Sequence, residues 1–271
     1  MKQSNSALSD SLKSVFTSGV IIFMIAVSIC IYLFVLGSPD NFVDGDPAGH
    51  PKEGNVMAIV YKGGVIVPIL ISCLLIVLAF SIERIFTISR AKGRGNVSAF
   101  VNKIRSLLAS GSIDQAIVEC DKQKGSVANV VKAGLVKYTE VSRDNSLDAE
   151  KKVLLIQKDI EETTQLEMPM LEKNLVIIAT LASIATLIGL LGTVLGMIKS
   201  FSAMATAGAP DPVGLANGIS EALINTALGI GTSAVAIVMY NYFTSKIDAL
   251  TYGIDEAGYS IVQNFTAKNK G

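Results

Sequence analysis

The sequence is poor in the residues that most often bind metals or carry redox chemistry. Among 271 residues there are three cysteines, one histidine and no tryptophan. No cysteine pair has metal-site or redox spacing, and His50 stands in a Pro/Gly-rich loop without a second ligand. No HExxH, GxSxG or Walker-type motif occurs. We therefore expect no metal, no cofactor and no enzymatic activity.

Charge is also scarce. Asp, Glu, Lys and Arg make up 17% of the chain, against about 25% in an average soluble domain. The formal net charge is zero, and no tract of interleaved basic and aromatic residues is present, so a nucleic-acid partner is not expected. Hydrophobic residues make up 50% of the chain and gather in four long runs. The sequence predicts an all-α integral membrane protein in a lipid bilayer.

Each apolar run is long enough to span a membrane as a helix, since about 20 helical residues cross the hydrocarbon core. A cleaved signal peptide is the alternative for the first run, and its length favours a span. The predicted transmembrane helices cover residues 16–36, 63–83, 174–200 and 215–243.

Basic residues set the expected orientation. Arg84, Arg90, Lys92 and Arg94 follow the second run at once, and such clusters mark the cytoplasmic side. Four spans then place both termini in the cytoplasm. The segments between the spans are a cytoplasmic N-terminus (1–15), a periplasmic loop (37–62), a helical cytoplasmic region (84–173), a periplasmic turn (201–214) and a cytoplasmic tail (244–271).

The helical pattern before the third span does not stop at the membrane. From about residue 149 to 201 it predicts one continuous helix of about 50 residues, or roughly 75 Å, which is twice what a bilayer needs. Pro169 is expected to bend this helix. We expect the last two transmembrane helices to extend far into the cytoplasm.

Glycines interrupt the last two spans where leucine would suit a lipid-facing helix better. Gly192 and Gly196 form a small-x-x-x-small pair, a spacing that lets membrane helices approach closely. Gly189 and Gly229 extend this pattern. We expect these four glycines to form packing contacts between helices or between subunits.

Polar residues follow the same two spans at helical spacing. Glu221 is the one ionisable residue in the fourth apolar segment, with Asn225 four residues later and Thr226 beside it. Thr186 and Thr193 lie seven apart on the third span. These five residues predict a polar proton path. The alternatives are an interfacial, structural Glu221 and hydroxyls bonded to their own backbone.

The last two spans contain the motifs GLLGTVLGMIKSF (189–201) and GISEALINTALG (218–229), followed by Tyr240-Asn241. These motifs resemble those of the MotA/TolQ/ExbB proton channel family, and they are most similar to the sequences of its ExbB and TolQ members. The resemblance implies a homopentamer in the bacterial inner membrane around an ExbD-like single-span partner that carries a protonatable aspartate. It also implies energy transfer through a TonB-like protein. Thr193 and Thr226 match the family's pore threonines, and Glu221 matches its glutamate.

The chain departs from the family's usual pattern at three points. Thr186 and Val235 stand where proline is usual, and the helix at 16–36 adds to the three-span ExbB plan. The predicted function is a proton-channel subunit of an ExbB–ExbD type motor that energises TonB-dependent outer-membrane transport. The alternatives are a TolQ-like or MotA-like motor subunit and a non-conducting membrane scaffold. A solute carrier is disfavoured because no inverted repeat of broken helices occurs.

Overall fold

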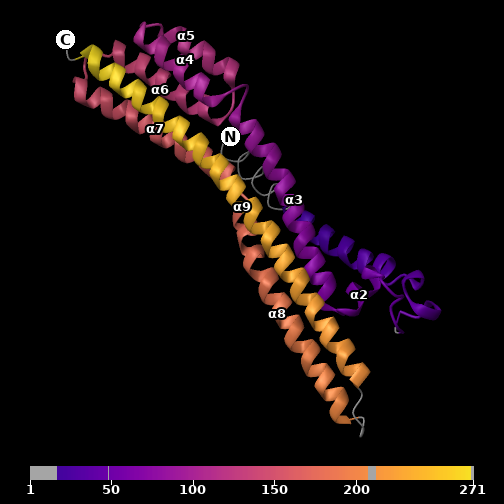
Figure 1. The fold of residues 1–271 in the computed structure, drawn as a ribbon. Coiled ribbons are helices and arrows are strands. Elements are labelled where there is room, and N and C mark those ends of the chain that lie inside the picture. The colour runs from indigo at the N-terminus through magenta and orange to yellow at the C-terminus, as the bar shows by residue number, and fades with distance from the viewer. Residues whose placement is uncertain (1–16, 48, 207–211, 270–271) are drawn as a thin grey trace. The chain divides into compact units, whose positions relative to one another are not determined.

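The computed structural model describes residues 17–47, 49–206 and 212–269, and most of these residues are helical, with no β-strand among them (Figure 1). Four helical segments are long and apolar enough to cross a membrane: Thr17–Leu36, Ile66–Ala109, Ala149–Ser202 and Gly218–Lys268. The predicted all-α architecture with four candidate spans is therefore confirmed. The predicted N-terminus at 1–15, residues 207–211 of the predicted turn at 201–214 and the final two residues lie outside the described residues.

The chain divides into two compact units, and three long helices contribute to both: α3 (Ile66–Lys92), α8 (Leu175–Thr206) and α9 (Pro212–Asn269). The first comprises Met1–Ser81 and Ile177–Tyr240, and the second Ile82–Val176 and Asn241–Gly271. The predicted boundaries between membrane and water stay predictions, because they depend on the depth of each helix in a bilayer.

The first unit begins with the apolar helix Thr17–Leu36, whose last turn is the π-helix η1 (Ile31–Leu36). Large apolar side chains on this helix are exposed, among them Phe34 at 74%. One end is anchored, since Tyr32 stacks on Tyr61 with ring centroids 4.6 Å apart and donates to the Tyr61 carbonyl. Most of its surface is thus exposed in the single chain.

The segment predicted as a loop at 37–62 has more structure than its proline and glycine content indicated. It holds two short 3-10 helices, η2 (Pro39–Asn41) and η3 (Val43–Gly45), and the helix α2 (Val56–Lys62). Asn55 caps α2, because its side chain accepts from the backbone N–H groups of Met57 and Ala58. The helix α3 (Ile66–Lys92) follows after Gly63, Gly64 and Val65.

The second unit is a helical bundle. Its parts are the end of α3, the helices α4 (Val97–Ala109), α5 (Ile113–Gln123), α6 (Ser126–Arg143) and α7 (Ala149–Glu172), and the C-terminal half of α9 (Pro212–Asn269). In Figure 1, α4 to α7 lie beside that half of α9. Tyr138 and Leu108 hold Asn264 of α9 through hydrogen bonds of 3.1 and 3.0 Å. Burial raises the pKa of Cys120 in this bundle to about 12, so its thiol is neutral.

The continuous helix predicted from about 149 to 201 is wrong in one respect. The chain breaks at Lys173-Asn174, so that α7 ends at Glu172 and α8 (Leu175–Thr206) begins three residues later. Asn174 has a left-handed backbone with φ of 66°, a conformation that asparagine adopts more readily than most residues. Pro169 lacks the N–H that would bond one turn back, which weakens the last turn before the break.

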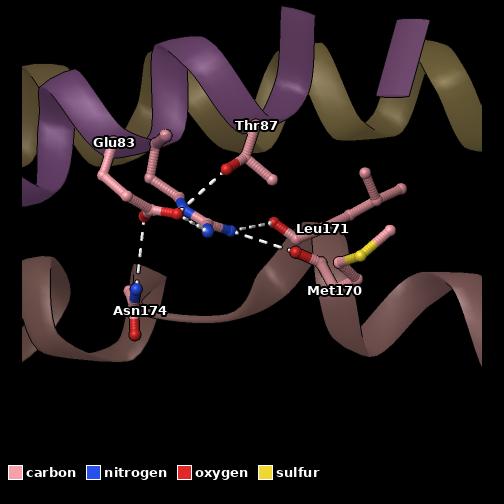
Figure 2. A network of polar contacts seen from close by, with 6 residues as sticks. Glu83, Thr87, Met170, Leu171 and Asn174 are labelled. Atoms are coloured by element: carbon pink, nitrogen blue, oxygen red, sulfur yellow. Dashed lines mark hydrogen bonds and ion pairs between the residues drawn. The ribbon is translucent and has the colours of Figure 1, made fainter. Parts of the chain in front are cut away.

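A buried arginine stabilises this break (Figure 2). Arg84 on α3 is 2% exposed and donates through Nη1 to the carbonyls of Met170 and Leu171, both at 3.1 Å. Such carbonyls in the last turn of a helix have no partner within the helix. The neighbouring Glu83 carboxylate accepts from Arg84 Nε at 2.7 Å and from Asn174 Nδ2 at 3.2 Å. The sequence singled out Arg84 as an orientation marker, and this structural role was not predicted.

Candidate functional site

The glycines of α8 and α9 bring the two helices into backbone contact. A Cβ added at Gly189 would lie 2.9 Å from the Asn225 carbonyl oxygen, and one at Gly229 would lie 2.9 Å from the Gly189 Cα. Added Cβ atoms at Gly192 and Gly196 would lie 2.6 and 2.8 Å from the Cβ atoms of Asn225 and Ala222. All four glycines thus pack within one chain, and a contact between subunits at this seam stays a prediction.

This close approach places two threonine hydroxyls against each other. Thr193 Oγ1 on α8 and Thr226 Oγ1 on α9 are hydrogen-bonded, and both side chains are half-buried. The carbonyl oxygens of Gly189 and Ala222 lie 3.3 and 3.2 Å from Thr193 Oγ1, and either can accept its single proton. Thr226 reaches the Gly189 carbonyl at 3.3 Å. The hydroxyls therefore join the two helices as well as bonding the backbone.

Glu221 has a basic partner on the neighbouring helix. Its Oε2 lies 3.7 Å from the Lys199 Nζ, with side-chain exposures of 24% for Glu221 and 80% for Lys199. The pair lies nearer the turn between α8 and α9 than the threonines do. An ion pair with one exposed partner contributes about 0–1 kcal/mol to stability. The carboxylate thus stays accessible for another role.

Asn225 is the most deeply buried of the predicted site residues, at 3% exposure. Its Nδ2 donates to the carbonyl of Gly63 at 3.0 Å, which ties α9 to the turn before α3. Its Oδ1 is buried without a hydrogen-bond partner among the described residues. An unpaired buried amide oxygen costs about 1–3 kcal/mol, which favours a donor that the single chain does not supply.

Thr186 stands apart from the other four polar residues. It is half-buried on α8, two turns before Thr193. Within the described segments, no hydrogen bond joins it to Thr193, Glu221, Asn225 or Thr226. The structure thus brings the two threonines together, places Asn225 directly before Thr226 and Glu221 about one turn earlier on α9, and leaves Thr186 outside this contact.

Two partners at this site were not predicted from the sequence, Lys199 and Gly63. Lys199 lies seven residues before the end of α8, and Glu221 nine residues after the start of α9. In two antiparallel helices joined by a short turn, residues equally far from the turn lie at the same level, so this pair could have been found by counting. Gly63 is distant in sequence and carries no side chain, so nothing pointed to it.

Comparison with known proteins places these motifs in a family. Residues 122–256, about half of the chain, match the sequence model of the MotA/TolQ/ExbB proton channel family. This range includes α8, the threonine pair and α9 as far as residue 256.

Curated relatives carry ExbB and TolQ names. A putative biopolymer transport protein ExbB-like 3 of Synechocystis sp. is 36% identical over 88 residues, covering 32% of this chain and 42% of the relative. A putative ExbB homolog of Methanothermobacter thermautotrophicus is 25% identical over 195 residues, covering 72% and 65%. The Tol-Pal system protein TolQ of Pseudomonas aeruginosa is 29% identical over 124 residues, covering 46% and 54%.

The chain therefore matches between about two fifths and two thirds of the length of these relatives. The family match covers the two helices that carry the glycine contacts and the threonine pair. From the family match and these relatives together, the chain is a member of the MotA/TolQ/ExbB proton channel family.

Proposed function

We propose that this chain is the proton-conducting subunit of an ExbB–ExbD type motor, which uses the proton motive force to energise TonB-dependent outer-membrane transport. The observation that carries the proposal is the hydrogen-bonded pair of Thr193 and Thr226. Hydroxyl groups both donate and accept, so a pair of them passes a proton or orders a water without holding a full charge. Family membership supports this assignment.

The proposed assembly supplies what the single chain does not. Thr193 and Thr226 would line a pore, with Glu221, Asn225 and Thr186 along its path, in a homopentamer in the bacterial inner membrane with both chain termini cytoplasmic. An ExbD-like single-span partner would carry the protonatable aspartate, and a TonB-like protein would receive the mechanical work. The unpaired Asn225 Oδ1 supports a further donor at this seam in the assembled state.

A TolQ-like role in envelope maintenance is the second candidate, because a Tol-Pal system protein is among the relatives. The threonine pair serves either system equally, so the site does not separate them. The two systems would be distinguished by identifying which single-span and outer-membrane-directed proteins co-purify with the chain. A non-conducting scaffold would bury the same hydroxyls against backbone, and only a flux measurement distinguishes it.

The test is proton flux in liposomes. The chain is purified with an ExbD-like single-span protein, reconstituted, and exposed to a potassium diffusion potential while an internal dye reports pH. We expect flux from the complex and none from the chain alone, because the acidic partner residue is absent from this sequence. A complex that conducts no better than empty liposomes would leave the scaffold as the function.

In the same assay, Glu221→Gln is expected to reduce flux about tenfold or more while leaving expression and assembly near wild type. The substitution keeps the shape of the side chain and removes its charge, and the ion pair that it breaks contributes little to stability. Lys199→Gln is the matched control, since it breaks the same ion pair and keeps the carboxylate. Equal losses in the two variants would make the ion pair, and not the carboxylate, the functional group.

A further inference from the structure

The second unit contains a cleft that the channel function does not use. Its volume is about 380 Å³, and it lies between the end of α3, the start of α4 and the middle of α9. The polar side chains that line it are those of Lys92, Ser89, Asn96, Ser98 and Lys246. The apolar ones include Ile85, Ile88, Tyr242, Phe243 and Leu250.

Two ammonium groups in this cleft are not neutralised. Lys92 is the last residue of α3, and Lys246 lies on α9 with its Nζ 5.5 Å from the Tyr242 ring centroid. Among the described residues, no carboxylate forms an ion pair with either lysine. No acidic residue lines the cleft either. An uncompensated positive charge in a concave site favours an anionic ligand.

The start of α4 adds to this preference. Asn96 caps the helix by accepting from the Ser98 backbone N–H at 2.9 Å, and Asn96, Val97 and Ser98 all line the cleft. The N-terminus of a helix of 13 residues carries partial positive charge and free N–H groups. The hydroxyls of Ser89 and Ser98 are further donors. The polar side of the cleft thus matches a phosphate group.

The other side of the cleft matches hydrocarbon. Ile88, Phe243 and Leu250 form its buried floor, while Ile85 and Tyr242 are 48% and 52% exposed. On α3, Ile82 and Phe86 are also exposed, at 57% and 66%. Lys246 comes three residues after the predicted end of the fourth span, where tyrosine and lysine typically meet lipid headgroups. One ligand that presents a phosphate and an acyl chain together would satisfy both sides.

We propose that this cleft binds the headgroup phosphate of an anionic phospholipid from the leaflet on the predicted cytoplasmic side. Lys92, Lys246 and the N-terminus of α4 hold the phosphate, and Ile85 and Tyr242 contact the start of an acyl chain. A free phosphate would use the polar side alone and leave the exposed apolar wall uncovered. The proposal does not depend on proton conduction, since no residue of the threonine pair takes part.

The test is native mass spectrometry of the full-length protein in a mild nonionic detergent, titrated with dioctanoyl phosphatidylglycerol or dioctanoyl phosphatidylcholine. We expect the wild-type chain to bind phosphatidylglycerol at least about tenfold more tightly than phosphatidylcholine. Substituting Lys92→Gln and Lys246→Gln together should remove that preference. Substituting Lys92→Arg and Lys246→Arg should keep it, because the charges are retained.

The matched control is Arg90→Gln with Arg94→Gln, which removes two positive charges from the same basic segment and leaves the cleft lining intact. If that pair loses as much binding as the lysine pair, general surface charge explains the affinity and the cleft assignment is wrong. Equal binding of the two lipids by the wild-type chain also overturns it. Displacement of phosphatidylglycerol by inorganic phosphate at equal concentration would identify a soluble-anion site instead. Lipid preference and phosphate displacement decide the question even if the glutamine pair fails to fold.

Discussion

Replacing Thr226 with valine is expected to reduce proton flux about a hundredfold or to background, while the chain still folds and assembles. Valine has nearly the same shape as threonine and lacks its hydroxyl, so the change removes one half of the hydroxyl pair. Thr193 keeps an acceptor, because the carbonyls of Gly189 and Ala222 both lie within hydrogen-bonding distance of its hydroxyl. No buried donor is left unpaired, and the cost in stability should be about 1 kcal/mol.

The experiment compares three variants in the liposome flux assay and by native mass measurement of the oligomer. Thr226→Ser retains the hydroxyl and should conduct. Thr266→Val makes the same substitution later on α9, where the hydroxyl only bonds the Val262 carbonyl one turn back, and should leave flux unchanged. Normal flux in Thr226→Val would show that the pair joins the helices without carrying protons. The protons would then pass through other residues of the complex, and the assignment of the pair to the proton path would be wrong.

The sequence predicted the helices well because their signal is long. Apolar runs of about 20 residues indicate spanning helices whatever their neighbours are, and all four candidate spans are present. The break at Asn174 was not predicted, since one left-handed residue does not disturb a periodicity that is averaged over many turns. Pro169 correctly indicated that the helix is disturbed in this region, and the interruption falls four residues after it.

The site was partly predictable for a related reason. The glycine and threonine positions on α8 and α9 follow from helical spacing and from the antiparallel arrangement that a short turn imposes. Their contact was therefore implied before the structure, though the sequence left open whether the glycines meet within a chain or between chains. Asn225 shows the limit, because its hydrogen bond goes to the backbone of Gly63, 162 residues away. Long-range contacts with backbone atoms leave no pattern in a single sequence.

Replacing Arg84 with methionine is expected to give the largest loss of stability of any single change considered. Arg84 is fully buried and makes four hydrogen bonds, two to the Glu83 carboxylate and two to the carbonyls that end α7. Methionine fills a similar volume and makes none of them. Removing one partner of a buried ion pair costs about 3–5 kcal/mol. The Glu83 side chain is 34% exposed and regains some hydration, so the expected cost is near the lower limit, at about 3 kcal/mol.

The loss should be local as well as global, because Arg84 holds the residues before the break between α7 and α8. Hydrogen exchange at the amides of residues 170–176 should accelerate, and the thermal midpoint of the purified protein should fall by several degrees. The stability of Arg84→Lys should lie between that of Arg84→Met and that of the wild type, since an ammonium keeps the charge but does not reproduce the guanidinium fork. Arg90→Met, on the exposed face of the same helix, should stay within about 0.5 kcal/mol of wild type. Unchanged exchange at 170–176 in Arg84→Met would mean that Asn174 and Pro169 define the break without the arginine.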